Sequence, residues 1–291
     1  MIDINILREN PEIISNSLDQ RQDKIDLKQI IDLDNQKRKL IQQSDELKYK
    51  KNIVSKKLSQ TTEKPISLIE EMRETGNEIK NLDFELDKIS TKLNCLLSTI
   101  PNIVSHNVPY GKNENENKVI KTEGEIKKFD FTPKPHWELG TNLNIIDFEK
   151  GVTTSGSRFF ILKGKGAKLQ RALINWMTDF HQKEFGCTEL YLPNLVNENT
   201  VFGSGQLPKF GENMYRDTDE NLWLIPTAEV PITGMHQNEV FNFENLPINY
   251  VAHTPCYRKE KASAGKDNRG MKRVHQFEKI EIYKLVDPQN S

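Results

Sequence analysis

A cation, two carboxylates and an aromatic ring occur at close spacing near the end of the chain. Arg258 and Glu260 directly follow an apolar run over 250–256, whereas Phe277 and Glu281 alternate with apolar residues after a basic stretch. This order is typical of two antiparallel strands joined by a long loop. Arginine binds phosphate through paired donors, an aromatic ring stacks on a base, and carboxylates hold Mg²⁺ or an ammonium. We therefore expect a site for a polyanion such as a nucleoside triphosphate. The alternative is a surface hairpin with a solvated loop.

The same stretch carries a long ordered motif. It reads Arg-Lys-Glu at 258–260, Ser-Ala-Gly at 263–265, Arg-Gly at 269–270 and His-Gln-Phe-Glu-Lys-Ile-Glu at 275–281. The motif resembles motif 2 of the class II aminoacyl-tRNA synthetases, in the form found in the seryl-tRNA synthetase family. Thr-Ala-Glu at 227–229 is similar to the amino-acid-binding loop of that family, although a Glu at the end of a strand is more often simply exposed.

The resemblance implies a role for each of these residues. Arg258 is the implied catalytic residue, which would hold the serine carboxylate and the α-phosphate of ATP together. The residues implied to contact serine are Thr227, Ala228, Glu229 and Glu281. Those implied to contact ATP are Arg258, Lys259, Glu260, Val274 and Phe277, with the Phe277 ring as the platform for adenine. Glu260 is implied to serve either the adenine amino group or the metal shell. Mg²⁺ is implied to bridge the pyrophosphate leaving group, and no metal ligand is assigned within the chain.

Two long segments in the first half of the chain repeat apolar residues every seven positions. The first repeat consists of Leu33, Leu40, Leu47 and Val54, widened by Ile30, Ile41 and Leu58. The second consists of Met72, Ile79, Leu86, Leu93 and Ile100, interleaved with Leu82, Ile89 and Leu96. A Thr-Thr-Glu-Lys-Pro break at 61–65 separates them, which predicts an antiparallel two-helix coiled coil over about 27–100. At 1.5 Å per residue this coiled coil is roughly 50 Å long.

Basic residues concentrate on the first of these two helices. Residues 27–60 hold nine Lys or Arg against four Asp or Glu, whereas residues 66–100 hold four against seven. Interhelical pairing is one explanation, and a positive stripe that follows a phosphate backbone is the other. The candidate lysines for such a stripe are Lys48, Lys50, Lys51 and Lys56. The seryl-tRNA synthetase family carries a coiled-coil arm that holds its tRNA, so the resemblance implies tRNA(Ser) as the partner.

The remaining elements are expected in the following order. Residues 1 to about 22 indicate short helices, with Asn10 capping, Pro11 at the first helical position and Ile13, Ile14 and Leu18 buried. Pro101 ends the second long helix, and the polar stretch 102–125 marks a domain boundary. Trp137 in Pro-Lys-Pro-His-Trp-Glu-Leu-Gly is expected to anchor packing. Strands are predicted over 157–162, 188–192 and 222–229, and a helix ended by Gly186 over 167–184. Helix, strand and Pro193 resemble motif 1, which implies a homodimer interface.

Composition excludes several classes of protein. The formal net charge is −1, so overall charge indicates no particular partner. The three cysteines lie far apart and form no Cys-x-x-Cys pair, and the histidines show no metal-ligand spacing. The first residues contain no apolar signal region, and no run of about 18 apolar residues predicts a membrane span. We expect a cytoplasmic protein.

The fold class expected is α+β. Residues 1–104 form a helical tRNA-binding arm, and residues 105–291 form a class II synthetase domain, a truncated antiparallel sheet with flanking helices. The implied function is that of a serine–tRNA ligase, which activates L-serine with ATP and transfers it to tRNA(Ser). Family members continue beyond this chain through a metal-binding carboxylate and the motif 3 arginine, so we expect the 291 residues alone to form no seryl-adenylate. The alternatives are an inactive coiled-coil RNA-binding protein and a ligase that charges a carrier protein, although such ligases lack the long arm.

Overall fold

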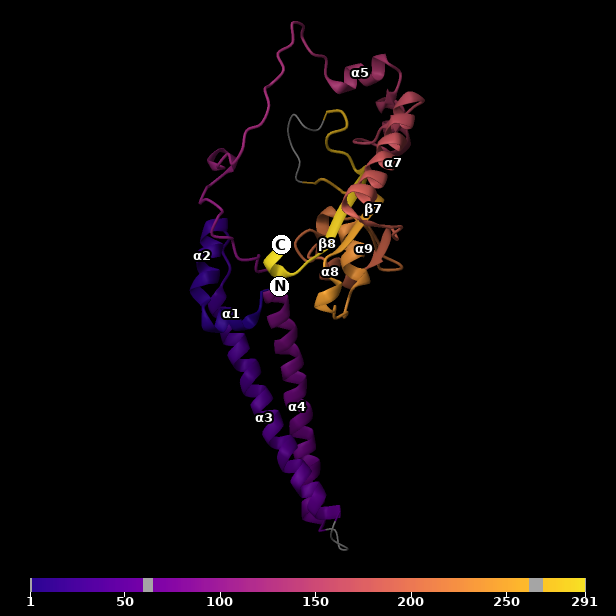
Figure 1. The fold of residues 1–291 in the computed structure, drawn as a ribbon. Helices are drawn as coiled ribbons and strands as arrows, with labels where there is room; N and C mark the ends of the chain where they lie inside the picture. Colours follow the sequence, from indigo (N-terminus) through magenta and orange to yellow (C-terminus); the bar gives the residue numbers. More distant parts are fainter. Residues whose placement is uncertain (1, 60–64, 262–268, 291) are drawn as a thin grey trace. The chain divides into compact units, whose positions relative to one another are not determined.

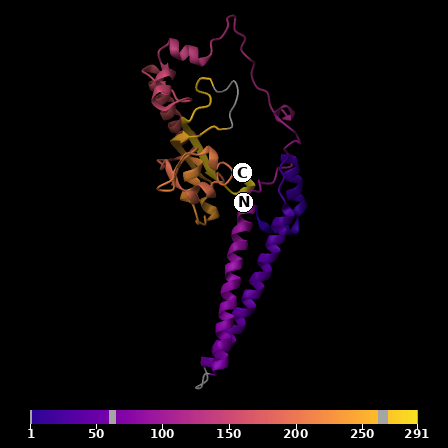
Figure 2. The same ribbon diagram turned by 180° about the vertical axis from the view of Figure 1, so that it is seen from behind.

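The computed structural model describes residues 2–59, 65–261 and 269–290. The chain forms two compact units, Met1–Gly124 and Glu125–Ser291 (Figures 1 and 2). Residues 61–64 of the predicted break at 61–65, and the Ser-Ala-Gly loop at 263–265, lie outside the described residues. Within the described ranges, no helix is both long and apolar enough to cross a membrane.

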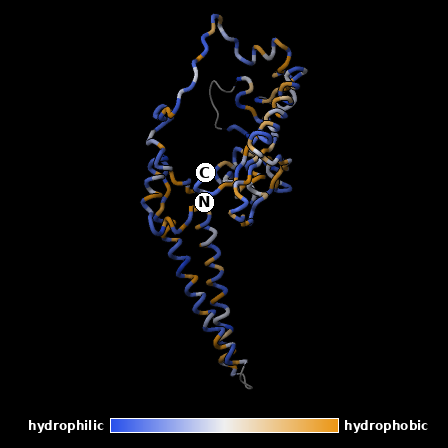
Figure 3. The backbone as a smooth tube through the Cα atoms, in the orientation of Figure 1, coloured by the Kyte–Doolittle hydropathy of each residue, from blue (hydrophilic) through white to orange (hydrophobic). Residues whose placement is uncertain are grey.

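The first unit is helical. Its helices are α1 (Ile4–Glu9), α2 (Pro11–Arg21), α3 (Leu27–Ser59) and α4 (Ile66–Leu97). The long helices α3 and α4 run antiparallel and pack along each other, which confirms the predicted coiled coil; we call this pair the arm. Hydrophobic residues recur along both helices among hydrophilic ones (Figure 3). After the arm, residues 105–124 contain only a single 3-10 turn, Glu114–Glu116.

The buried core of the first unit lies at the base of the arm. Here α1 and α2 pack against the start of α3 and the end of α4, around Leu7, Ile14, Leu18, Ile30, Leu33, Leu93 and Leu97. Farther along the arm, Leu40, Leu47 and Val54 are only half-buried. Two helices cover just one seam of each other, so the burial is partial there. Ile41, which widens the apolar stripe of α3, is 38% exposed for the same reason. In α2 the prediction that Ile13 is buried was wrong, since Ile13 is 46% exposed.

An ion pair ties the base together. Arg8 donates two hydrogen bonds of 2.7 Å to the carboxylate of Asp34, from Nε and from one terminal nitrogen. Asp34 is 3% exposed whereas the Arg8 side chain is 36% exposed, so the carboxylate is the buried member of the pair. The hydrogen bond from Arg8 lowers the pKa of the Asp34 carboxyl below its ordinary value. Asp3 caps α1 through its side chain, whereas Asn10 before Pro11 makes no such bond.

The second unit contains three small sheets. The first pairs β1 (Ile146–Asp147) with β2 (Ile161–Leu162). The second has the order β4 (Leu195–Asn197), β6 (Leu222–Leu224), β5 (Arg216–Asp217). The third places β7 (Ile248–Tyr257) between β3 (Thr188–Leu190), which is parallel to it, and β8 (Gln276–Leu285), which is antiparallel. The two antiparallel strands predicted around 250–282 are thus confirmed, and residues 262–268 between them lie outside the described residues.

The helices of the second unit's described residues are α5 (His136–Asn142), α6 (Phe148–Ser155), α7 (Lys165–Phe185), α8 (Glu198–Gly203) and α9 (Glu229–Met235). Helix α7 packs on β7 and β8 and α9 on β8, whereas α5, α6 and α8 pack against the shorter strands. Helix α7 ends at Gly186, as predicted, because that residue takes the left-handed conformation with φ 61°. Helix α9 packs on β8, where the hydroxyl of Thr233 lies 3.1 Å from that of Tyr283.

Two predicted strands are shorter than expected. Only Ile161–Leu162 of the run 157–162 is a strand, because Arg158 turns the chain with φ 64°. The run 222–229 leaves the sheet after Leu224, and Glu229 begins α9. An apolar run of this length is consistent with a strand or with a buried bend, and periodicity does not separate the two.

Candidate active site

The register of β7 and β8 gathers the predicted site residues on one face of the sheet. Cys256 pairs with Phe277, Thr254 with Lys279 and Ala252 with Glu281. Since successive side chains of a strand point to opposite faces, Phe277, Lys279 and Glu281 share a face with one another. Tyr283 continues this face and contacts α9. The face that carries Phe277 and Glu281 is therefore the one toward α9.

A closed triangle of polar contacts lies at the centre of this face. The hydroxyl of Thr227 donates to Glu281 Oε2 at 2.6 Å, and Lys279 Nζ donates to the same hydroxyl at 2.8 Å. Lys279 Nζ also lies 2.5 Å from Glu281 Oε2. Thr227 is 5% exposed and the Glu281 side chain 19%. The structure thus joins two of the four residues predicted to contact serine.

The other two predicted serine residues have different surroundings. Ala228 is fully buried and packs in an apolar cluster with Leu192, Ile232 and Ala252. Glu229 is exposed at the first position of α9. A carboxylate in the first turn of a helix is favoured by the exposed N–H groups there. The structure therefore brings neither side chain into the triangle.

Arg258 is held beside the triangle by two neighbours. Its Nε donates to the carbonyl of Pro226 at 3.3 Å, and its guanidinium carbon lies 5.1 Å from the centre of the Phe277 ring. Its backbone N–H donates to the carbonyl of His275 at 2.9 Å, which continues the pairing of the two strands beyond Tyr257. Because Pro226 precedes Thr227, the bond to Pro226 connects the arginine to the serine candidates.

Glu260 lies where the chain leaves β7. Its φ of 47° is unusual for a residue with a side chain. Arg158 donates to the Glu260 carbonyl at 2.8 Å, and the carboxylate of Glu260 lies 3.8 Å from a terminal nitrogen of Arg273. Two arginines thus hold this turn. Lys259 is fixed through its backbone, which donates to the Asn213 carbonyl, and its ammonium lies 5.6 Å from the centre of the Tyr215 ring.

The two apolar residues predicted to contact ATP line a common cavity. Val274 is 5% exposed and Phe277 is half-buried. The cavity of about 710 Å³ is otherwise lined mainly by apolar side chains of α7, of β8 and of the segments around β1 and β2. Phe277 therefore lines the cavity, and the Arg258 guanidinium lies over its ring.

Sequence reasoning missed three contributors to this region. Lys279 lies two positions from both Phe277 and Glu281, so the strand period alone places it on their face. Arg158 was assigned to a strand, although it serves the turn at Glu260. His136 accepts a hydrogen bond of 2.9 Å from the Met271 amide, and its neighbour Trp137 packs against the Arg269 guanidinium at 5.0 Å. No local pattern signals that contact.

The arm lysines predicted to bind RNA fall into two groups. Lys48 is turned toward α4, where its ammonium lies 3.0 Å from Asp83. Lys51 is also near α4, since a Cβ at Gly76 would lie 3.4 Å from its ammonium. Lys50 and Lys56 are exposed. Only the second pair is thus placed on the surface of the arm without a contact to α4.

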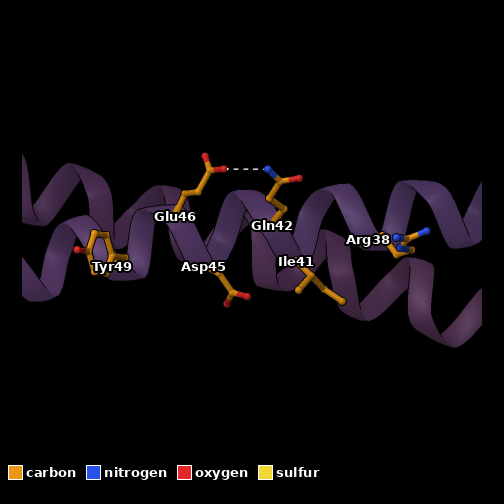
Figure 4. Close-up of a pocket in the computed structure, with 6 residues that line it drawn as sticks. All are labelled: Arg38, Ile41, Gln42, Asp45, Glu46 and Tyr49. Atoms are coloured by element: carbon orange, nitrogen blue, oxygen red, sulfur yellow. Dashed lines mark hydrogen bonds between the residues drawn. The ribbon is translucent and has the colours of Figure 1, made fainter.

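A shallow groove on α3 lies beside these lysines. It is lined by Arg38, Ile41, Gln42, Asp45, Glu46 and Tyr49, which all project from the one helix (Figure 4). Gln42 donates to Glu46 at 3.0 Å, and Tyr49 is 68% exposed. The groove thus combines an exposed aromatic ring with charges of both signs.

Comparisons with known proteins cover both units. Residues 1–104 match the family model described as the seryl-tRNA synthetase N-terminal domain. Residues 211–291 match the tRNA synthetase class II core domain of the glycine, histidine, proline, serine and threonine enzymes.

Individual relatives align over the whole chain. A serine–tRNA ligase of Dehalococcoides mccartyi is 46% identical over 291 residues, and this chain spans 69% of its length. One from a Roseiflexus species is 47% identical over 294 residues, with the same 69% of its length spanned. Among solved structures, the seryl-tRNA synthetase of Pyrococcus horikoshii complexed with ATP superimposes with a TM-score of 0.88 at 32% identity, covering 100% of this chain and 71% of that one. The cytoplasmic serine–tRNA ligase of Naegleria fowleri in complex with AMP gives 0.83 at 30% identity, covering 99% and 68%.

Proposed function

This chain belongs to the seryl-tRNA synthetase family, and from that premise we propose how its residues divide the work of activating serine. The function is that of a serine–tRNA ligase, a class II aminoacyl-tRNA synthetase that uses ATP. In the first step the serine carboxylate attacks the α-phosphate of ATP, and pyrophosphate leaves. The carboxylate is already an anion, so this step needs no protein nucleophile or general base. The protein acts by positioning the reactants and by stabilising charge.

Thr227 and Glu281 bind the serine ammonium in this proposal. Both present oxygen atoms on the face toward α9, and Glu281 carries the negative charge that an ammonium requires. A buried acceptor left without its donor costs free energy, so the pair discriminates against ligands that lack the amine. Ala228 shapes the wall of the site, and Glu229 acts from the rim, at the start of α9.

Arg258 is the proposed catalytic residue. Its guanidinium is held between the Pro226 carbonyl and the Phe277 ring, next to the Thr227–Glu281 pair. A planar guanidinium can hold a carboxylate and a phosphate oxygen at once, as charge moves onto the phosphorus. This link from Arg258 through Pro226 to Thr227 is the single observation that carries the proposal, because it joins the phosphate-binding and amine-binding groups at one place. Lys259, Glu260, Val274 and Phe277 form the remaining proposed ATP contacts.

The proposed Mg²⁺ enters with ATP. Among the residues that the structure describes, no three His, Cys, Asp or Glu side chains cluster closely enough to hold a metal ion. Mg²⁺ usually keeps several waters and binds through substrate phosphates with one or two carboxylates, so a protein cage is not needed. These residues therefore do not fit a preformed Mg²⁺ site, and the roles proposed for them involve no metal.

We propose tRNA(Ser) as the partner of the arm. The exposed lysines Lys50 and Lys56 carry the phosphate contacts, and Lys48 and Lys51 contribute from the side of α4. Each ammonium that neutralises a phosphate releases a counterion, which makes the affinity depend on salt.

We also propose that the protein acts as a homodimer in the cytoplasm. The motif 1 region, α7 and β3, exposes an unusual amount of apolar surface for one region: Leu169, Leu173, Trp176, Phe180 and Tyr191 are 58%, 43%, 60%, 39% and 101% exposed. Apolar patches of this kind favour association with another protein surface. Sedimentation velocity with Trp176→Glu, against the unaltered protein, tests the dimer.

The binding of a stable seryl-adenylate analogue tests the proposed function. We expect the full-length protein to bind 5′-O-(N-seryl)sulfamoyl adenosine far more tightly than ATP or serine alone, since the analogue fills both halves of the site. Calorimetry measures this directly. The threonyl and glycyl analogues are the controls, and equal affinity for all three would contradict a serine-specific site.

A further inference from the structure

The contacts of Lys279 determine the direction of every hydrogen bond in the triangle. A lysine ammonium only donates, so the Thr227 hydroxyl must accept from Lys279 and must give its own proton to Glu281. No other arrangement satisfies the two distances of 2.8 Å and 2.6 Å. The hydroxyl proton is thus already committed within the protein.

This direction has a consequence for any ligand at the site. The Thr227 oxygen keeps one lone pair, and the Glu281 carboxylate keeps its other oxygen, while neither group has a proton to offer. Thr227 and Glu281 therefore present acceptors alone, whereas Lys279 keeps its third N–H. A ligand group that only donates, such as a primary ammonium, matches the acceptors of Thr227 and Glu281.

The charges of Lys279 and Glu281 also bear on how the acceptors are held. Lys279 and Glu281 carry opposite charges 2.5 Å apart, and their side chains are 34% and 19% exposed. The lysine compensates the partly buried carboxylate while no ligand is bound, and it holds that carboxylate against Thr227. Without this neighbour Glu281 keeps only the hydrogen bond from Thr227, and the hydroxyl that makes it is no longer oriented by a donor.

We propose that Lys279 is a positioning residue for the serine ammonium, which orients Thr227 and Glu281 as acceptors without touching the nucleotide. The proposal rests on the proposed function, because it assigns the ammonium of serine to this triangle. In this proposal Lys279 serves the serine ammonium, whereas Arg258, at the Pro226 end of the same face, acts on phosphate.

A pair of ligands that differ only in the amine tests this role. Seryl-sulfamoyl adenosine carries the ammonium, and the 3-hydroxypropionyl analogue lacks it while keeping the hydroxyl, the linker and the nucleotide. Both are titrated by calorimetry into the full-length protein and into Lys279→Met, which keeps the length of the side chain and removes its charge. Lys284→Met on the same strand is the matched control, since Lys284 is exposed.

We expect Lys279→Met to weaken the seryl analogue by roughly tenfold to a hundredfold, the range that a misaligned hydrogen bond to a charged group spans. The affinity of Lys279→Met for the desamino analogue and for ATP should change by no more than about twofold. The affinity of Lys284→Met for every ligand should also change by no more than about twofold. Lys279→Arg retains the donor and the charge, and recovers most of the affinity. Circular dichroism confirms that each variant is folded, and Lys279→Gln replaces Lys279→Met if that protein does not fold.

Equal losses for the two analogues would overturn the inference, because Lys279 would then act on the nucleotide or on the fold in general. Unchanged affinity for both would also overturn it. If the unaltered protein binds neither analogue, the proposed function itself fails, which is a different outcome from a selective failure of Lys279.

Discussion

The guanidinium carbon of Arg258 lies 5.1 Å from the centre of the Phe277 ring. A cation over an aromatic ring is stabilised by about 0.5–2 kcal/mol, so the ring helps to fix the arginine before any ligand arrives. The contact covers one face of the ring. An adenine at Phe277 must therefore stack on the opposite face or displace Arg258.

Replacement of Arg258 tests its part in catalysis. We expect Arg258→Ala to lower kcat/KM for adenylate formation by about 10²–10³-fold, because the developing charge on phosphorus loses its donor. The measurement is serine-dependent pyrophosphate exchange by the full-length protein. Arg216→Ala is the matched control, since Arg216 also lies over a ring, that of Trp223, at 5.0 Å. Near-normal exchange by Arg258→Ala would remove Arg258 from the mechanism.

Replacement of Glu281 should affect the binding of serine but not that of ATP. Glu281→Gln keeps the shape of the side chain and removes the charge that pairs with Lys279 at 2.5 Å. We expect the KM for serine to rise by roughly tenfold or more while the KM for ATP changes little, because only serine brings an ammonium to this place. Steady-state exchange at varied serine and varied ATP measures both. Parallel losses for the two substrates would contradict the assignment.

We expect replacement of the two groups of arm lysines to have different effects on tRNA binding and on the stability of the arm. The double variant Lys50→Gln, Lys56→Gln should reduce the slope of log affinity for tRNA(Ser) against log salt by about 1.4–1.8, since each lost phosphate contact reduces it by about 0.7–0.9. Lys48→Gln breaks the 3.0 Å contact with Asp83 and should lower the stability of the arm as well. Filter binding at several salt concentrations measures the slope, and serine activation serves as the unaffected control. An unchanged slope for the double variant would mean that these lysines only face solvent.

The Arg8–Asp34 pair predicts how acid acts on the base of the arm. The bond from Arg8 holds the pKa of Asp34 below its ordinary value in the folded protein. The contribution to stability is therefore complete above the unfolded-state pKa of about 3.9 and is lost as pH falls through the lower folded-state value. Asp34→Asn should cost about 1–2 kcal/mol at pH 7, a range reduced because Arg8 is 36% exposed. Urea unfolding at pH 7 and pH 3 measures it, and the difference between the two proteins should shrink at the lower pH.

The contact between His136 and Met271 predicts the protection of one amide. Met271 donates its N–H to His136 Nε2 at 2.9 Å, so His136→Ala should speed hydrogen exchange at Met271. Gly270→Ala should do the same, because a Cβ at that position would lie 2.1 Å from His136 Nε2, and the backbone there has φ 86°. Amide exchange followed by NMR resolves this site. Retained protection in both variants would show that another group holds the amide.

Sequence patterns predicted most of the long elements and the two antiparallel strands of the site. The seven-residue repeats gave the arm because each helix has one apolar seam, and Gly186 gave the end of α7 because only its conformation fits there. Alternation along 276–285 put Phe277 and Glu281 on the same face, and the same rule applies to Lys279.

Contacts between distant segments were not predictable in this way. The sequence leaves Lys48 either in an interhelical pair or in a stripe that faces a phosphate backbone, and its pairing with Asp83 depends on the exact rotation of α3 against α4. The roles of Arg158 at Glu260 and of His136 at Met271 join residues 102 and 135 positions apart. Propensities and periods act over a few residues, so they carry no information about such pairs.

The parallel pairing of β3 with β7 has a consequence for how the protein folds during its synthesis. Thr188 pairs with Tyr250, 62 residues later in the chain, whereas α3 and α4 meet through a short connection. Local contacts form quickly, and distant ones first require closure of a long loop. Because the ribosome releases the N-terminal end first, we expect the arm to be folded while β7 and β8 are still being synthesised. Until β7 emerges, β3 has no partner in its sheet, and the nascent chain exposes that strand to chaperones.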